Sequence, residues 1–408
     1  MTFRILSLDG GGIRGVIAAR ILQVVEQQLG GPLSQHFDLI AGTSTGSLLA
    51  AGVTLGFSSE RLINLYQERG KTIFPYGDWW GYLMPQRLKL IAQYGLTSFP
   101  PSLSVPKFSD AGLLKVLQTE LGDRKFCQIS SAQISNGESQ KLLVTTYDTI
   151  RRMPLVFKSW RHDKWYANVP LWEICACSAS APSYFPAHRL LVRADGTAKG
   201  ATPQTLTLAA TPWQDADDYY KMQIEILAGP GKGQRASIER YDAATQTATM
   251  AQHWSVVPDA TSTYRLIGEF STIDGGVGAN NPTACAIAEA LRLGHAPQDI
   301  QVLSIGTGQP EGSIPWVEAR QWGILRWAWN ARIIGVTMDA PSGIHAYVSQ
   351  QIIADDHYLR IQPKLNYSKE GIDNASQENL ANLRRDAEAC LSQVQGRLTH
   401  FLKTNWLS

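Results

Sequence analysis

Phe3-Arg-Ile-Leu-Ser-Leu8 leads into Asp9-Gly-Gly-Gly-Ile-Arg-Gly15, and the same order returns where Asp38-Leu-Ile-Ala41 leads into Gly42-Thr-Ser-Thr-Gly46. In both places a short apolar run ends in a glycine turn, which is typical of a buried parallel strand. Apolar residues then recur at helical spacing after each turn. A β-α-β-α order predicts a parallel sheet with helices on both faces.

Later parts of the chain continue this alternation. The helix after the first turn should end at Gly30-Gly31-Pro32, a strong stop signal. Apolar residues in steps of three and four predict a long amphipathic closing helix from about Ser376. Further strands are expected at Lys141–Tyr147 and Gln301–Gly306, and further helices at Ser47–Leu55, Leu113–Leu121 and Thr283–Leu293. We therefore expect an α/β fold, a three-layer α/β/α sandwich with a mostly parallel central sheet.

Residues 194–267 break the pattern and predict an inserted β-rich module. Lys221–Ile226 and Arg235–Arg240 alternate polar and apolar residues, and Gly229-Pro-Gly-Lys-Gly233 is a turn signal between them. The main catalytic domain would then comprise residues 1–193 and 268–408. The insert resembles small β repeats of phage virion proteins, and both a binding role and a passive decoration are consistent with it.

The composition is that of an ordinary soluble globular protein. The 408 residues are 44% hydrophobic and 18% charged, with a formal net charge of +2. This charge gives no electrostatic case for nucleic acid and only a mild one for anionic lipid. We find no signal peptide and no apolar run of the roughly 18–20 residues that span a bilayer. Five scattered cysteines, an odd number, indicate reduced thiols and a cytoplasmic protein.

Gly42-Thr-Ser44-Thr-Gly46 stands between an expected strand and an expected helix. A sharp strand-to-helix turn projects a serine oxygen outward, and small neighbours permit the bend. The helix N-terminus then stabilises negative charge on an attacked carbonyl. We interpret Ser44 as a nucleophile. The alternative is a plain turn with a helix cap at Ser44 or Thr45.

The first glycine turn also fits the G-x-G-x-x-G pattern of dinucleotide-binding proteins. That fold needs an acidic residue at the end of the second strand, where this chain has Gly42-Thr-Ser44. We therefore favour an oxyanion hole, because consecutive glycines let several N–H groups point to one place. Arg14 adds a permanent positive charge and a means of holding the loop. Asp9 is most simply a turn residue.

Phe270-Ser-Thr-Ile-Asp274 is an apolar strand that runs into a carboxylate and the turn Gly275-Gly276. A partly desolvated aspartate is more basic than usual and can accept a proton from serine directly. In isolation, a turn aspartate before glycine is the commoner reading. A serine–histidine–acid triad is the other option, with His188 the least unfavourable of eight histidines. No motif for a metal or a cofactor occurs.

Together these motifs resemble the patatin-like phospholipase family, whose members have a serine–aspartate dyad in an α/β sandwich. The similarity extends to Ser178–Pro186, Asp274–Pro282, Ser304–Gly308 and the closing helix. The resemblance implies that Ser44 is the nucleophile and Asp274 the base. It also implies an oxyanion site at Gly10, Gly11, Gly12 and Arg14, and supporting turn glycines at Gly15, Gly42, Gly46, Gly275 and Gly276. The insert separates Pro186 from Asp274 more widely than is usual in the family.

The resemblance also implies a lipid acyl hydrolase that acts on phospholipids or other lipid esters without a cofactor. Two aromatic stretches suit a membrane interface or a lid: residues 74–84 with Arg87 and Lys89, and residues 316–336. The second would equally well pack a core. Alternatives are an acyltransferase using the same dyad, a binding or virion-associated protein that works through its insert, and a membrane-degrading defence effector. The sequence carries no signal for oligomeric state.

Overall fold

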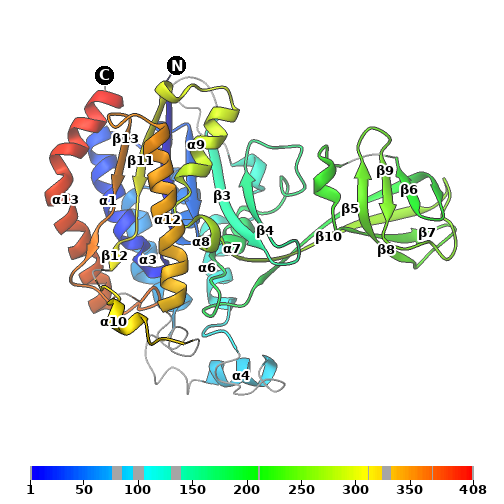
Figure 1. The fold of residues 1–408 in the computed structure, drawn as a ribbon, viewed down its shortest axis with the longest axis horizontal. Coiled ribbons are helices and arrows are strands. Elements are labelled where there is room, and N and C mark those ends of the chain that lie inside the picture. Colours follow the sequence, from blue (N-terminus) through cyan, green and yellow to red (C-terminus); the bar gives the residue numbers. More distant parts are fainter. Residues whose placement is uncertain are drawn as a thin grey trace.

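The computed structural model describes residues 2–75, 85–94, 105–129, 139–209, 212–310, 312–323, 332–369 and 371–406. A central sheet runs through the main body of the molecule (Figure 1). Five of its strands are parallel and lie in the order β13 (Tyr358–Ile361), β11 (Ile300–Ile305), β1 (Phe3–Leu8), β2 (Leu39–Thr43) and β3 (Lys141–Asp148). β4 (Met153–Lys158) continues the sheet antiparallel to β3.

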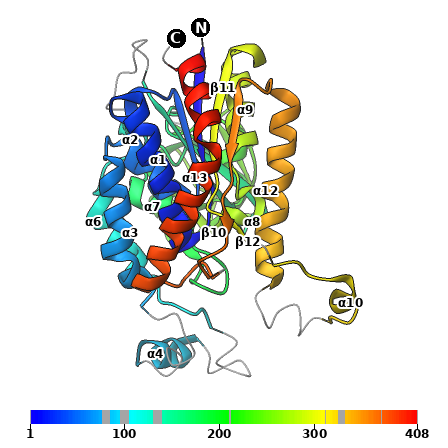
Figure 2. The same ribbon diagram turned by 90° about the vertical axis from the view of Figure 1, so that its left-hand side faces the viewer.

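Helices cover both faces of this sheet, which gives three layers (Figure 2). One face carries α1 (Gly15–Leu29), α2 (Thr45–Thr54), α3 (Ser59–Ile73), α6 (Ala111–Leu121), α7 (Leu171–Ala179) and α13 (Gln377–Asn405). The other carries α8 (Gly276–Ala279), α9 (Thr283–Arg292) and α12 (Arg332–Ile352). Successive strand residues belong to different cores, since Leu6 packs on the first face and Ile5 on the second.

The expected elements of the main body are present. α1 ends at Gly30, whose φ of 71° is the left-handed conformation of a helix stop. The Ser376 hydroxyl caps α13 by accepting the N–H of Asn379 at 3.2 Å. α2 begins at Thr45 rather than at Ser47, so Ser44 lies directly at its N-terminus. The short helices α4 (Pro85–Tyr94) and α10 (Trp316–Ala319) lie below the sandwich in Figure 1.

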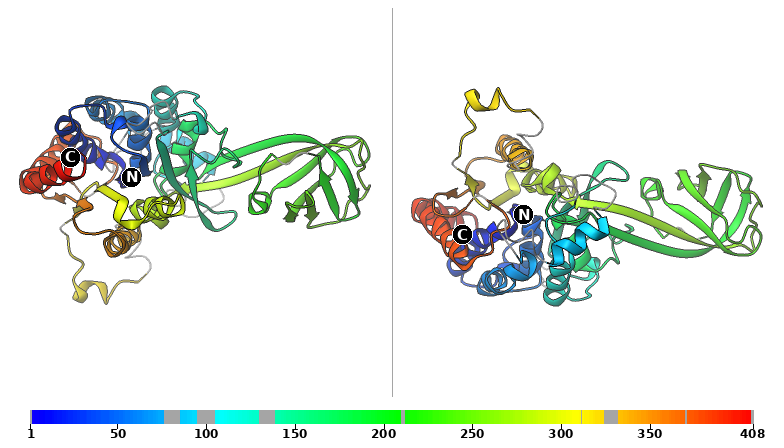
Figure 3. Two further views of the ribbon diagram at one scale, coloured as in Figure 1. Left: turned by 90° about the horizontal axis from the view of Figure 1, so that it is seen from above. Right: turned by 90° about the horizontal axis from the view of Figure 1, so that it is seen from below.

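The inserted segment forms a closed antiparallel barrel at the end of a long arm (Figure 3). Its strands are β5 (His188–Thr202), β6 (Thr205–Leu208), β9 (Thr247–Met250), β8 (Arg235–Asp242), β7 (Gln223–Ala228) and β10 (Thr263–Asp274). The ring closes because β10 pairs with both β5 and β7. Closure leaves no unpaired edge in the barrel.

The barrel changes the character of the sheet as a whole. Among the described residues, the sheet has twelve strands, and β5 and β10 carry its hydrogen bonding into the barrel. The expectation of a mostly parallel sheet is therefore wrong for the complete sheet and applies to the five central strands alone. One reason is that short turns join β5 to β6, β7 to β8 and β8 to β9, and such turns favour antiparallel pairing.

Within the described ranges, no helix combines the length and the apolar character that crossing a bilayer requires.

Candidate active site

Strand β3 brings together the carboxyl ends of β2 and β10, two strands that are far apart in the sequence. β2 pairs with it in parallel up to Thr43, which lies opposite Thr145. β10 pairs with it in antiparallel fashion up to Asp274, which lies opposite Thr146. β4 pairs along the other edge of β3, so β2 and β10 lie along the same edge and their carboxyl ends face each other. The residue after Thr43 and the last residue of β10 therefore meet.

Ser44 occupies the turn between β2 and α2 with φ 54° and ψ −124°. Residues other than glycine rarely adopt this strained region, which costs on the order of 1–3 kcal/mol. Glycines on both sides allow the turn to close: a Cβ on Gly46 would lie 2.2 Å from the carbonyl oxygen of Leu8, and one on Gly42 would lie 2.2 Å from that of Gly46. The Ser44 N–H donates to Ser178 Oγ at 2.8 Å, which holds the strained conformation.

The Ser44 hydroxyl donates to Asp274 Oδ2 at 2.5 Å. The other carboxylate oxygen of Asp274 accepts the Gly276 N–H at 2.7 Å. Asp274 is 1% exposed. Burial raises its pKa to about 6, against the opposing effect of the hydrogen bonds from Ser44 and Gly276. The carboxylate is therefore ionised at neutral pH and yet a better proton acceptor than an exposed aspartate.

Histidine takes no part in this pair. Within the described chain, no histidine hydrogen-bonds to Ser44 or Asp274. His188 faces Glu173 instead, at 3.5 Å, at the start of β5. The arrangement is thus a direct serine–carboxylate contact rather than a triad.

The glycine loop lies beside Ser44, but its groups differ in their availability. The Gly10 N–H already donates to the carbonyl oxygen of Asn280 at 3.0 Å, so it is not a free oxyanion donor in this conformation. The N–H groups of Gly11 and Gly12 have no hydrogen-bond partner in the part of the chain that the structure describes. Gly12 has φ 58° and lines the same pocket as Ser44.

Arg14 holds the loop from behind. Its side chain is buried and donates to the carbonyl oxygens of Gly11 and Gly308, both at 3.4 Å. Its charge therefore acts on the backbone of the loop. The sequence suggested that Arg14 either adds a positive charge to the oxyanion site or holds the glycine loop, and these contacts support the second role.

Sequence reasoning missed two supporting residues. Ser178 links both halves of the site, since its hydroxyl accepts the Ser44 N–H and its carbonyl oxygen accepts the Gly275 N–H at 3.2 Å. Arg360 forms a bidentate pair with Asp9, at 2.7 and 2.5 Å, just before the glycine loop. The small-residue run around Ser178 was a detectable signal. Arg360 carried none, because it is separated from Asp9 by 351 positions.

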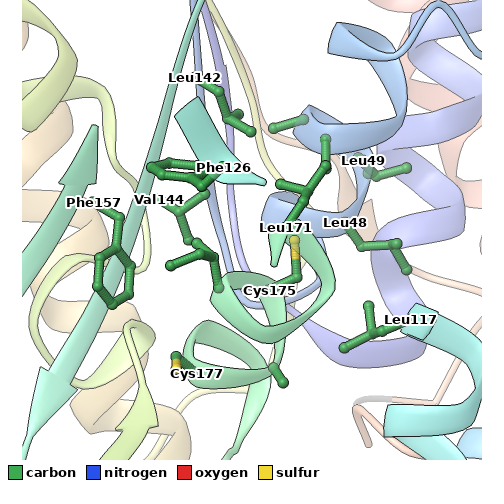
Figure 4. Close-up of a cluster of buried hydrophobic side chains, with 14 of the residues drawn as sticks. Leu48, Leu49, Leu117, Phe126, Leu142, Val144, Phe157, Leu171, Cys175 and Cys177 are labelled. Carbon is green, nitrogen blue, oxygen red and sulfur yellow. The ribbon is translucent and has the colours of Figure 1, made fainter. Parts of the chain in front are cut away.

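An apolar pocket opens beside Ser44, between α2, α3, α6 and α7. Besides Ser44 and Gly12, its walls include Leu48, Leu113, Leu117, Cys175 and Phe185. Figure 4 shows Leu48, Leu117 and Cys175 gathered near one another within this core. Phe74, Phe108 and Phe185 pack as an aromatic cluster, with ring centroids 5.6 to 5.8 Å apart. Burial raises the pKa of the Cys175 thiol to about 12, so the thiol does not compete with Ser44 as a nucleophile.

The two aromatic stretches are described only in part. Residues 76–84 of the first and 324–331 of the second lie outside the described residues. At the start of the second stretch Trp316 is 71% exposed, so this part does not pack a core.

The Patatin-like phospholipase family model matches residues 6–208, the part of the chain that contains the glycine loop and the serine turn. The chain belongs to this family. Patatin-like protein 2 of Oryza sativa subsp. indica is 26% identical over 432 residues, which cover 97% of this chain and 85% of that protein. Patatin-04/09 of Solanum tuberosum is 25% identical over 424 residues, with 95% and 83% covered.

Among solved structures, human GIVD cytosolic phospholipase A2 matches with a TM-score of 0.42 and 12% identity, over 100% of this patatin-like chain and 60% of the other. Family membership supports a lipid acyl hydrolase.

Proposed function

We propose that this patatin-like protein hydrolyses carboxylic esters of lipids, phospholipids among them, through the dyad of Ser44 and Asp274. The observation that carries the proposal is the 2.5 Å hydrogen bond from the Ser44 hydroxyl to a buried carboxylate, at the mouth of an apolar pocket. Nucleophilic catalysis needs a base within hydrogen-bond reach of the nucleophile, and this contact supplies one.

The reaction begins when Ser44 Oγ attacks the ester carbonyl and its proton passes to Asp274. The carbonyl oxygen becomes an oxyanion, which the free N–H groups of Gly11 and Gly12 stabilise. Collapse of the tetrahedral intermediate breaks the ester bond, and the departing alcohol takes the proton from Asp274. Water then attacks the acyl-enzyme with Asp274 again as the base, which releases the fatty acid and restores Ser44.

The apolar pocket is proposed to hold the acyl chain. Its lining is almost entirely aliphatic and aromatic, and it reaches from Gly12 and Ser44 to Leu117 on α6. Burial of a chain in such a pocket is favourable by about 0.8 kcal/mol for each methylene group. The phospholipid head group then remains outside, on the side of the alcohol that leaves.

We assign the chemistry to residues 1–193 and 268–408, because Ser44, Asp274 and the glycine loop all lie there. Residues 194–267 would act as a separate module. Free cysteines among the described residues are consistent with a cytoplasmic protein, which would contact membranes peripherally to reach its substrate.

The test is incubation with mixed phospholipids followed by mass analysis of the products. Free fatty acid and the matching lysolipid should appear with the natural protein. Ser44→Ala and Asp274→Ala should lower turnover by roughly a thousandfold or more. Matched controls are Ser392→Ala on α13 and Asp259→Asn in the barrel, both exposed and remote from the pocket. Near-normal activity in Ser44→Ala would exclude the dyad as the catalytic pair. Acyl transfer to added glycerol would instead identify an acyltransferase.

A further inference from the structure

A second, polar pocket lies behind the glycine loop. Gly12 faces the apolar pocket, whereas Asp9 and Arg14 face this polar one. Its other walls come from Thr307 and Gln309 after β11, Gln362 after β13, and one side of α12. Its empty space is about 680 Å³, including the side that is open to solvent. The two pockets are therefore separated by the residues that would form the oxyanion hole.

The topology of the sheet marks this place as a binding crevice. From β1 the chain continues to β2 on one side, and it later returns to β11 on the other side of β1. In open α/β sheets, ligands bind outside the carboxyl ends of the strands at such a switch point. Thr307 and Gln362 both follow carboxyl ends of these strands.

The pocket is lined largely by polar side chains, several of which can donate hydrogen bonds. The carboxylate of Asp9 is already satisfied, because Arg360 donates to both of its oxygens and the Ser342 hydroxyl donates to Oδ2 at 3.3 Å. Asp339 adds a carboxylate, but it is exposed. The lining also contains the guanidinium of Arg14, which donates to two backbone oxygens, and the carboxamides of Asn280, Gln309 and Gln362.

Asn280 is the second observation that points to a ligand. It is 7% exposed, lines the pocket, and its carboxamide has no hydrogen-bond partner within the described residues. Neither polar atom of this carboxamide is fully buried, so both are open to the pocket and accessible to a ligand. A carboxamide beside a guanidinium matches a small oxyanion, which accepts hydrogen bonds from both.

Residues of this pocket also hold the glycine loop. Arg14 donates to the carbonyl oxygen of Gly11, and Thr307 Oγ1 donates to that of Gly10 at 2.5 Å. The carbonyl oxygen of Asn280 accepts the Gly10 N–H. A ligand that contacts Arg14 and Asn280 would therefore affect the conformation of the glycine loop.

We propose that this pocket binds a small oxyanion of the phosphate type, and that its occupancy fixes the glycine loop and raises turnover at Ser44. The regulatory half of this statement rests on the proposed function, whereas the binding half does not. A free phosphate and the phosphate of a lipid head group share the chemistry, so the experiment compares the two.

Binding is measured first, in the Ser44→Ala protein, so that catalysis plays no part. Inorganic phosphate should raise the melting temperature in a saturable way, beyond the effect of chloride at equal ionic strength. Ala346 lines the pocket from α12, so Ala346→Glu places a carboxylate in it and should weaken phosphate binding by about tenfold or more. Asp339→Asn removes a like charge and should tighten binding. Arg20→Gln, on α1 and outside the pocket, changes the net charge by the same amount as Ala346→Glu and is the control for that change.

Turnover is measured second, with a soluble nitrophenyl ester and the natural protein. Phosphate should raise kcat at least about twofold, and Ala346→Glu should abolish the rise. A stronger effect of glycerol 3-phosphate than of phosphate would identify the head group as the source. Binding that is unsaturable, or that Ala346→Glu leaves unchanged, overturns the site. Binding without any change in kcat overturns the regulatory half. Absence of esterase activity with intact phosphate binding contradicts the proposed function but leaves the site standing.

Discussion

Replacing Asp274 with asparagine should stabilise the protein while it abolishes catalysis. Asp274 is buried, and within the described residues its carboxylate accepts two hydrogen bonds, from Ser44 and Gly276. Its pKa is raised from 3.8 to about 6, chiefly by burial, so the folded state resists ionisation of this carboxyl. The charge that the proposed mechanism needs at neutral pH is therefore a charge that the fold disfavours.

The difference between these two pKa values corresponds to roughly 3 kcal/mol, since one unit is about 1.4 kcal/mol. In the unfolded chain the carboxyl ionises near pH 4, whereas in the folded chain it ionises near pH 6. The stability that Asp274 contributes is therefore fully present below pH 4 and is lost as the pH rises to about 6. Asparagine does not ionise, so it avoids this loss. We expect Asp274→Asn to raise the free energy of unfolding by about 1–3 kcal/mol at pH 8, allowing for a weaker hydrogen bond to Ser44.

Urea denaturation at pH 8 and at pH 4.5 measures this effect, with esterase assays on the same samples. The gain should be large at pH 8 and small at pH 4.5. Asp163→Asn is the control of opposite sign, because Arg161 lowers the pKa of Asp163 to about 2 and the substitution should destabilise at pH 8. In the natural protein, kcat/KM should rise with pH through about 6. A loss of stability in Asp274→Asn that is equal at both pH values would refute the reasoning.

Three further predictions concern the elements around the dyad. Gly46→Ala should lower the free energy of unfolding by about 1–3 kcal/mol and remove activity, because its Cβ would lie 2.2 Å from the backbone oxygen of Leu8; an unchanged urea midpoint would contradict this. Leu117→Trp should lower kcat/KM for palmitoyl esters about tenfold relative to butyryl esters, since Leu117 lines the apolar pocket; an unchanged chain-length profile would exclude acyl binding there. Asp9→Asn should destabilise by about 3–5 kcal/mol, because Asp9 is buried and its loss of charge leaves the largely covered Arg360 without a counter-charge; urea denaturation measures this, and a loss within error would show that the pair is dispensable.

The parts of the fold that depend on local chemistry could be predicted from the sequence. α1 and α13 occupy their expected ranges because their limits are set by Gly30 and by the Ser376 cap. The predicted partners Ser44 and Asp274 lie in contact because each ends a strand at a glycine turn. These signals lie within a few residues of the features that they specify.

The features that escaped prediction depend on pairing across long stretches of chain. No local pattern indicates that β10 would bond to both β5 and β7 and so close a barrel. The partner of Asp9 is equally hidden, because an arginine on β13 looks like any other strand residue. The occupied N–H of Gly10 is also invisible in the sequence, since its acceptor is the backbone oxygen of Asn280.

One strand belongs to both the barrel and the site. β10 pairs with β7 up to Ile267 and with β5 up to Thr272, and its last residue is Asp274. Buried and partly buried residues alternate strictly along it. Because side chains alternate between the faces of a strand, inserting or deleting one residue here would turn the carboxylate away from Ser44. A change in the length of a turn between barrel strands leaves this alternation unaltered. In the stem of β10, residues 268–273, only insertions or deletions of two residues keep the carboxylate on the same face. Any replacement of the barrel by another module must therefore preserve the alternation of faces along residues 268–273.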